Sequence, residues 1–205
     1  MIGVGCKTKL IHIALLFGLL AVGAHTQDSY NSPLDTSGQA VIDGRSRPYL
    51  IRHLPVNAFP QLPSAIQAEL NHRGCLIPQT YEAHQPENVV HASLEHKDSS
   101  DWAVLCSVKG TVSLLVFFAS NVNAPTVLAS APETSRLQAH GASDILGFNW
   151  GIDPAPPEQV HEAQLNMRHP PARVDHDALA DSVVDGPAIY RFYSHNAWTT
   201  LDTGD

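Results

Sequence analysis

The strongest pattern of apolar positions lies in the middle of the chain and predicts β-strands there. Three segments are rich in Val, Leu and aromatic residues: Asn88 to Leu94, Trp102 to Val108 and Val112 to Phe118. In the second and third segments both alternating faces carry apolar side chains, which indicates strands that are covered on both sides. The tripeptide Lys109-Gly110-Thr111 fits a short hairpin link between them. We expect these strands to form the core.

A four-residue spacing of apolar side chains predicts a helix ahead of these strands. The spaced residues are Leu62, Ile66 and Leu70. Pro63 suits the first helical position, and Gly74 suits a left-handed helix stop. A second, shorter helix is expected over Pro157 to Gln164, where the segment begins with a proline.

Shorter apolar segments complete the predicted fold. Thr126 to Ala129 and Ile145 to Trp150 are expected to extend the same sheet. Ala188 to Tyr193 and Ala197 to Leu201 predict a second hairpin around Ser194-His195-Asn196. The expected fold class is α+β, a mainly antiparallel β-sheet with a few short helices, in a single domain over residues 61–205.

Residues 25–60 are rich in Ser, Asp, Asn, Gly and Pro and show little apolar periodicity. Such a composition predicts a flexible leader. Its one apolar cluster is Tyr49-Leu50-Ile51, with Leu54 just beyond, and it is bounded by Pro48 and Pro55. This cluster is expected to add an edge strand at most.

Residues 1–24 have the pattern of a secretory signal peptide. Lys7 and Lys9 form a charged start, an apolar stretch runs from Leu10 to Val22, and small residues precede His25, the expected first residue after cleavage. A membrane anchor is the alternative, but the apolar stretch is shorter than the roughly 20 residues of a spanning helix. The sequence therefore predicts a periplasmic or secreted protein without a stable membrane anchor.

The charge balance is acidic and restricts the possible partners. The chain has 12 Lys and Arg against 20 Asp and Glu, a formal charge of −8. Nucleic acids and anionic membranes require clustered basic residues, so neither is an expected partner. The length is sufficient for one domain with its own hydrophobic core.

Two cysteines, Cys75 and Cys106, remain after removal of the signal peptide. In an oxidising compartment an even pair favours one disulfide, which would connect the end of the first helix to the central strand. The alternative is a pair of buried thiols that pack as small apolar side chains. Neither cysteine has a Cys-x-x-Cys partner, so both are expected to be structural.

Residues 88–118 resemble a degenerate FG-GAP or VCBS-type repeat, in which an acidic loop precedes an apolar strand. The segment from Ala92 to Asp101 has the length of that loop, and Trp102-Ala103-Val104-Leu105 continues it as the strand. In the family the acidic positions bind calcium; here they carry Ser93, Glu95, Lys97 and Asp101. A lysine repels a cation, so calcium is not expected at this loop.

The family closes a propeller from several repeats, whereas this chain has one such unit. The segments RGCLIPQ, DWAVLCS and LGFNWG give the mature chain a closer resemblance to uncharacterised exported proteins of environmental bacteria. That resemblance implies export and a β-sheet, and it implies no particular activity.

Histidine is the most unusual part of the composition, with 12 residues. The densest group of potential metal ligands is Asp175-His176-Asp177, to which His161 or His169 could add a ligand. The alternative is a solvated turn whose aspartates cap the next segment. The chain lacks the His-x-x-x-His and His-x-His spacings, and no cofactor is expected.

No catalytic residue is assigned from the sequence, because Gly-x-Ser-x-Gly is absent and both cysteines are expected to be bonded. Asp181 and Asp185 have a spacing that is common on exposed segments. Five late aromatic residues are expected either to line a carbohydrate or peptide groove or to join the core: Trp150, Tyr190, Phe192, Tyr193 and Trp198. The sequence favours a non-enzymatic exported module that binds a protein or carbohydrate; the alternative is an exported hydrolase or metal-binding protein with a His/Asp site.

Overall fold

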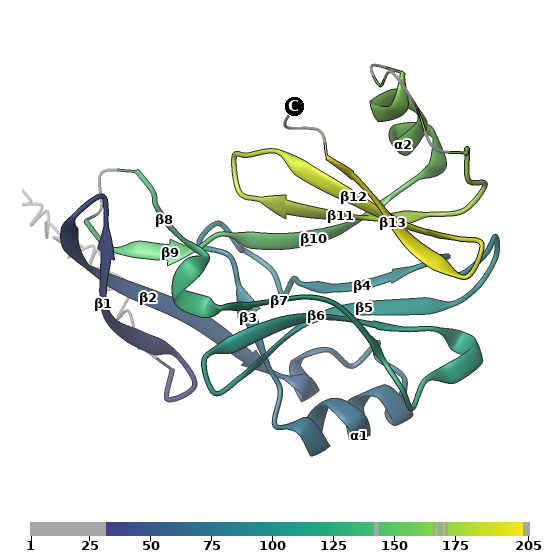
Figure 1. The fold of residues 1–205 in the computed structure, drawn as a ribbon. Coiled ribbons are helices and arrows are strands. Elements are labelled where there is room, and N and C mark those ends of the chain that lie inside the picture. Colours follow the sequence, from purple (N-terminus) through teal and green to yellow (C-terminus); the bar gives the residue numbers. More distant parts are fainter. Residues whose placement is uncertain (1–31, 142–143, 166, 168–169, 171, 203–205) are drawn as a thin grey trace, which may run out of the picture. The chain divides into compact units, whose positions relative to one another are not determined.

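The central strands predicted from the sequence form the middle of a large sheet. We describe residues 32–141, 144–165, 167, 170 and 172–202 in a computed structural model. The sheet's central strands are β3 (Leu76–Gln79), β4 (Val89–Ala92), β5 (Asp101–Val108), β6 (Thr111–Phe117) and β7 (Thr126–Pro132) (Figure 1). β6 pairs antiparallel with β5 and β7, while β3 and β4 pair with the other edge of β5. The prediction of central strands is confirmed.

A long strand near the N-terminus continues this sheet. β2 (Arg45–Pro55) pairs antiparallel with β1 (Thr36–Ile42) and β3, and parallel with β9 (Leu146–Phe148). β9 in turn pairs with β8 (Leu137–Ala139). Asp43 and Gly44 form the two-residue turn between β1 and β2, and both have positive φ angles, of 52° and 73°.

The prediction of a flexible leader over residues 25–60 is therefore wrong from Thr36 onward. Residues 25–31, with the predicted signal peptide, lie outside the described residues. β2 lies inside the sheet because its two edges gain partners from segments far along the chain, which composition alone does not reveal. Strands of the sheet therefore begin at Thr36, ahead of residue 61.

The later strands form a second, wholly antiparallel sheet. Its strands are β10 (Trp150–Ala155), β11 (Ala178–Val183), β12 (Ala188–Ser194) and β13 (Ala197–Asp202), in that order. The predicted hairpin around His195 is confirmed. The expectation that Ile145 to Trp150 extends the central sheet holds for Leu146–Phe148, which form β9 of that sheet. It fails for Trp150, because the chain leaves the first sheet after β9 and enters the second after one residue, Asn149.

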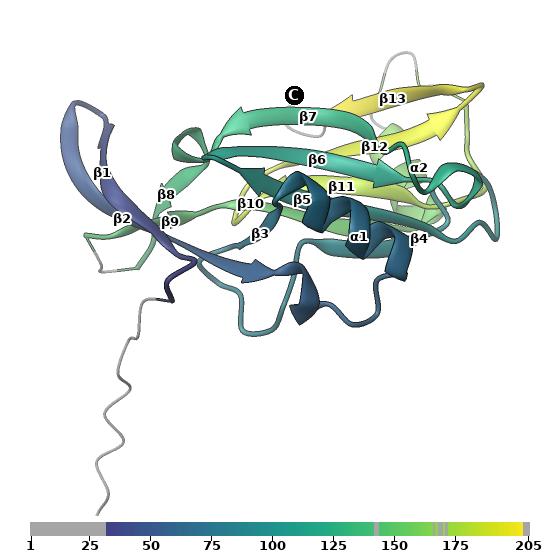
Figure 2. The same cartoon turned by 90° about the horizontal axis from the view of Figure 1, so that it is seen from below.

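The apolar side chains of the two sheets form three cores among the described residues. Side chains from one face of β5 and β6 pack with Trp150 and Ile152 of the second sheet. The opposite face of β5 and β6 packs on helix α1 (Ser64–Arg73), which lies across these strands in Figure 2. Helix α2 (Pro157–Gln164) covers the outer face of the second sheet. Every residue of β5 except Val108 is buried, which confirms that this strand is covered on both sides.

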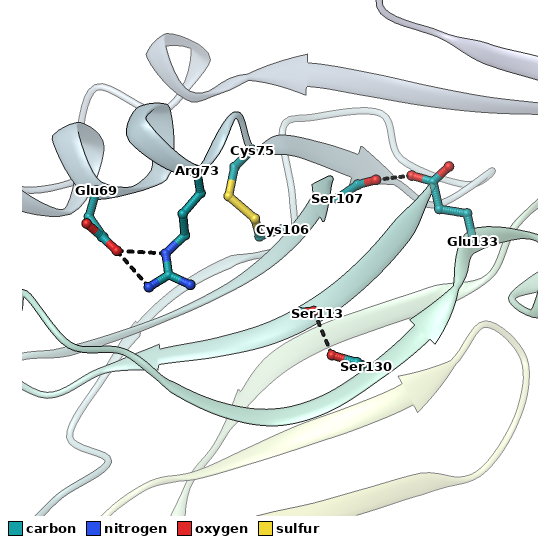
Figure 3. Close-up of a disulfide and its surroundings, with 8 residues drawn as sticks. All are labelled: Glu69, Arg73, Cys75, Cys106, Ser107, Ser113, Ser130 and Glu133. Atoms are coloured by element: carbon teal, nitrogen blue, oxygen red, sulfur yellow. Dashed lines mark hydrogen bonds and ion pairs between the residues drawn. A yellow bond between two sulfur atoms is a disulfide. The ribbon is translucent and has the colours of Figure 1, made fainter. Parts of the chain in front are cut away.

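The disulfide joins α1 to the centre of the large sheet. Helix α1 ends at Gly74, whose φ of 73° is the left-handed stop expected from the sequence. Cys75 follows directly and is bonded to Cys106 of β5, with a Cα–Cα distance of 5.2 Å (Figure 3). Closing a loop of 31 residues stabilises the fold by about 3 to 4 kcal/mol in the entropy model.

The described residues also form three short 3-10 helices: η1 (Val56–Ala58), η2 (Ala119–Asn121) and η3 (Glu133–Ser135). Within the part of the chain that the structure describes, no helix has both the length and the apolar character needed to cross a membrane.

A buried polar group lies where β2, β5 and η3 meet. His53 Nε2 is 2.8 Å from Glu133 Oε1. Ser107 donates a hydrogen bond to the same oxygen, and Figure 3 shows this second contact. All three residues are buried. Burial pushes the pKa of Glu133 upward, but the hydrogen bonds from His53 and Ser107 and the charge of His53 outweigh this effect, so the pKa lies below its usual value.

We expect the Glu133→Gln variant to be less stable at neutral pH by about 1 to 3 kcal/mol, because it removes the charge from two buried hydrogen bonds. The folded-state pKa of Glu133 lies below its usual 4.5. The carboxylate therefore adds stability above that value, and this stability is lost as the pH falls through the folded-state pKa. The variant should lose less stability than the wild type between about pH 5 and 3.

Denaturant unfolding followed by circular dichroism across this pH range measures both effects. Glu69→Gln is the matched control, because Glu69 pairs with Arg73 on the partly exposed surface of α1. Glu69→Gln should lower the free energy of unfolding by less than about 1 kcal/mol. Identical acid sensitivity in the wild type and Glu133→Gln would contradict the role given to this carboxylate.

Candidate functional site

A polar cleft of about 610 Å³ lies among the segment after β3, the end of β8 and the turn between β11 and β12. The side chains that line it include Tyr81, Glu82, His84, Gln138, His140 and Asp185. A volume of this size is in the range of small-molecule sites in proteins. The cleft is therefore the first candidate for a binding site.

Two stacked rings form part of its wall. The ring centroids of Tyr81 and His140 lie 4.4 Å apart, and the ring planes differ by 6°. Gly147 of β9 lies directly against this pair. A Cβ atom at Gly147 would lie 2.4 Å from Tyr81 Cβ and 3.2 Å from His140 Cδ2. Only glycine allows the backbone of β9 to approach the stack so closely.

The Tyr81 hydroxyl is held by polar neighbours. It donates to Asp185 Oδ2 at 3.5 Å and accepts a hydrogen bond from Gln138 Nε2 at 3.3 Å. Gln138 is oriented in turn by Asn149 Nδ2, which donates to Gln138 Oε1 at 3.1 Å. Partial burial, followed by the charges of Asp185 and Glu82, raises the pKa of Tyr81. The phenol therefore stays protonated at physiological pH.

Backbone contacts fix the segments that carry these side chains. The Tyr81 amide donates to the carbonyl of Phe148, and the Val184 amide donates to the carbonyl of Asn149, each at 2.9 Å. The Arg52 guanidinium donates to the carbonyls of Thr80 and Ala83, at 3.2 and 2.7 Å. The cleft is thus preorganised by the ends of strands in both sheets.

The metal ligands proposed from the sequence are used for other contacts. His176 is buried and donates from Nε2 to the carbonyl of Tyr193 at 2.7 Å, while its Nδ1 lies 3.3 Å from Asp175. Asp177 accepts a hydrogen bond from the Ser93 amide. His161 lies apart on α2, and His169 is outside the described residues. Among the described residues, no three His, Cys, Asp or Glu side chains converge as metal ligands.

The calcium-like loop is organised by one buried carboxylate. Asp101 accepts hydrogen bonds from four donors: the amides of Leu94, Glu95 and Ala119 and the hydroxyl of Ser99. Ser93 donates to the carbonyl of Ser99, and Glu95 accepts from Ser120. Lys97 is exposed. Asp101 therefore binds amides of its own loop and of η2. The resemblance to the FG-GAP repeat stays a prediction.

The late aromatic residues divide between core and surface. Trp150, Tyr190 and Phe192 are buried in the cores. Tyr193 and Trp198 are half-buried and pack on Phe118. These five side chains do not line the Tyr81 cleft.

The two carboxylates at positions 181 and 185 also have separate roles. Asp181 is buried between the sheets, where it accepts from the indole of Trp150 and pairs with Arg191 at 2.7 Å. Asp185 is exposed in the cleft and has a φ of 56° in the β11–β12 turn. They do not form a pair.

Sequence reasoning missed Tyr81, Gln138 and His140. The partners of Tyr81 in the cleft lie 57 and 104 residues away along the chain, so no local motif joins them. The one local signal is Gly147, a glycine inside an apolar strand, which is typical of a site where another group approaches the backbone closely.

Gly147→Ala should displace the Tyr81–His140 stack, because the new methyl group would overlap Tyr81 Cβ. We expect a loss of about 1 to 3 kcal/mol in the free energy of unfolding, together with a change in the ring-current shifts of both rings. Gly151→Ala is the matched control, since its Cβ would meet only Ser182 and Thr80 atoms at 3.6 and 3.8 Å. Thermal unfolding and NMR spectra measure both effects. Equal behaviour of the two variants would rule out the close approach at Gly147.

Comparison of this chain with protein-family models, curated proteins and solved structures gives no match. The chemistry of the Tyr81 cleft therefore has to be inferred from its own residues.

Proposed function

We propose that this chain is an exported, non-enzymatic binding module that holds a small polar ligand in the Tyr81 cleft. The observation that carries the proposal is the Tyr81–His140 stack, which rests against the bare backbone of Gly147 at the wall of a polar cleft. Stacked rings in a protein core do not border a cleft, and stacked rings on an open surface do not pack closely against a strand. The Tyr81–His140 stack does both.

The cleft offers the groups that small-molecule recognition requires. Aromatic rings provide a flat apolar surface, while the Gln138 amide and the carboxylates of Glu82 and Asp185 provide hydrogen-bonding groups. These groups come from separate segments that are joined by backbone hydrogen bonds. A rigid site of this kind orients a ligand at a low entropic cost.

The same site is poorly suited to nucleophilic catalysis. Its described lining contains no Ser, Thr or Cys, and the raised pKa of Tyr81 makes its phenolate a minor species at neutral pH. Ser107, His53 and Glu133 lie together elsewhere, but all three are buried and Glu133 accepts from both of the others. We therefore favour binding over hydrolysis.

Export is supported by the signal-like pattern of residues 1–24 and by the disulfide. The full chain, expressed in a bacterium with an outer membrane, should reach the periplasm or medium. Its mass should correspond to a start at His25, with the loss of the pair of hydrogens that a disulfide removes. Leu16→Arg, which places a charge in the apolar stretch, should stop cleavage. Wild-type chain that stays in the cytoplasm with its N-terminus intact would refute export.

Binding can be tested with ¹⁵N-labelled protein and a fragment set of neutral sugars, carboxylates and amines. At least one class should shift the resonances of Tyr81, Gln138 and His140. His140→Ala should weaken that binding about tenfold, because it removes half of the stack. His96→Ala is the matched control, since His96 is exposed on the β4–β5 loop. If no class shifts the cleft resonances, the proposed function fails.

A further inference from the structure

We infer that the ligand of the Tyr81 cleft carries a cationic group, an ammonium or a guanidinium such as a lysine or arginine side chain presents. This inference rests on the proposed binding function and adds the chemical class of the ligand. It stands on three features of the cleft: its carboxylates, the absence of lysine and arginine from its described lining, and its aromatic stack.

Two carboxylates reach the cleft from different segments. Glu82 follows Tyr81 directly, and Asp185 lies in the β11–β12 turn; both side chains belong to exposed residues. Asp185 has a left-handed backbone, with a φ of 56°, which places it at the tip of a tight turn. Burial, and after it the charges of Asp185 and Glu82, raise the pKa of the Tyr81 hydroxyl, so both carboxylates lie close enough to act on the ring that lines the cleft.

The neighbouring arginines are engaged outside the cleft. Arg52 donates to the carbonyls of Thr80 and Ala83, behind the segment that carries Tyr81. The Arg136 guanidinium lies 4.3 Å from the centroid of the buried Trp150 ring. Neither arginine is among the residues that line the cleft. The carboxylates of Glu82 and Asp185 therefore lack a lysine or arginine partner within this lining.

Carboxylates beside an aromatic surface form the combination that proteins use to bind organic cations. The ring face attracts a cation through its quadrupole, and the carboxylates add charge and hydrogen-bond acceptors. A guanidinium also stacks on flat rings, which favours arginine over lysine. A neutral sugar would use the acceptors but gain nothing from the negative charge.

The net charge of the whole chain also favours a cationic ligand. With a formal charge of −8, the protein attracts cationic partners and repels anionic ones at a distance. Charge complementarity therefore favours a basic peptide or another organic cation over an acidic ligand at this site.

The test compares two probes that differ in charge and little in shape: N-acetyl-arginine methylamide and its neutral citrulline counterpart. The full mature protein is titrated with each and followed by NMR at about pH 8, above the range in which histidine ordinarily titrates. The arginine probe should bind at least about tenfold more tightly and shift the resonances of Tyr81 and Asp185. Its affinity should fall as salt is added.

Asp185→Asn removes one charge and keeps the turn, because asparagine tolerates a left-handed backbone. This variant should bind the arginine probe about three- to tenfold more weakly than the wild type. Asp98→Asn is the matched control, since Asp98 is also exposed and has a φ of 65°. It should leave the affinity unchanged.

Equal binding of the arginine and citrulline probes at the cleft would overturn the inference and leave the proposed function intact. So would binding of neutral sugars alone. If the arginine probe, the sugars and the carboxylates all leave the cleft resonances unmoved, the proposed function falls together with the inference. Equal weakening by Asp185→Asn and Asp98→Asn would show that overall charge, and not this cleft, attracts the probe.

Discussion

The passage of the chain from one sheet to the other at Gly147–Trp150 is the constraint on which the rest of the structure depends. Trp150 is fully buried between the sheets, where its indole donates to Asp181. The side chain of Asn88 joins the sheets beside it, because it donates to the carbonyl of Trp150 and accepts from the Ile152 amide. These bonds satisfy backbone groups that would otherwise be buried without partners at the edge of the second sheet.

The first three of these residues, Gly147, Phe148 and Asn149, also support the cleft. Gly147 lies against the ring stack, the Phe148 carbonyl accepts from the Tyr81 amide, and Asn149 binds both the Gln138 side chain and the amide of Val184, next to Asp185 in the β11–β12 turn. Each side of the site is therefore attached to the crossover segment. Packing of the core and geometry of the site are coupled, which explains how exposed side chains on short segments keep a fixed arrangement.

The parts of the fold that sequence could predict have local signals. Gly74 ends α1, and Lys109-Gly110 and His195-Asn196 make hairpin turns in which both residues have positive φ angles. Asp43-Gly44 is a turn of the same kind and predicts the β1–β2 hairpin, but the polar composition around it favoured a flexible leader instead. The division into two sheets has no such signal, because an apolar strand does not specify which sheet it joins. The site could not be predicted either, because its residues are far apart along the chain and come together only when the two sheets pack.

The carboxylates of the core and of the cleft differ in how many hydrogen bonds they accept. Among the described residues, three acids are buried, Asp101, Glu133 and Asp181, and each accepts hydrogen bonds from several donors. These carboxylates are compensated because an unpaired buried charge is costly. Asp185 is exposed and has only a long bond from Tyr81. Folding therefore depends little on the charge of Asp185, and this carboxylate, beside an aromatic surface, stays free to contact the cation that we propose as the ligand of the cleft.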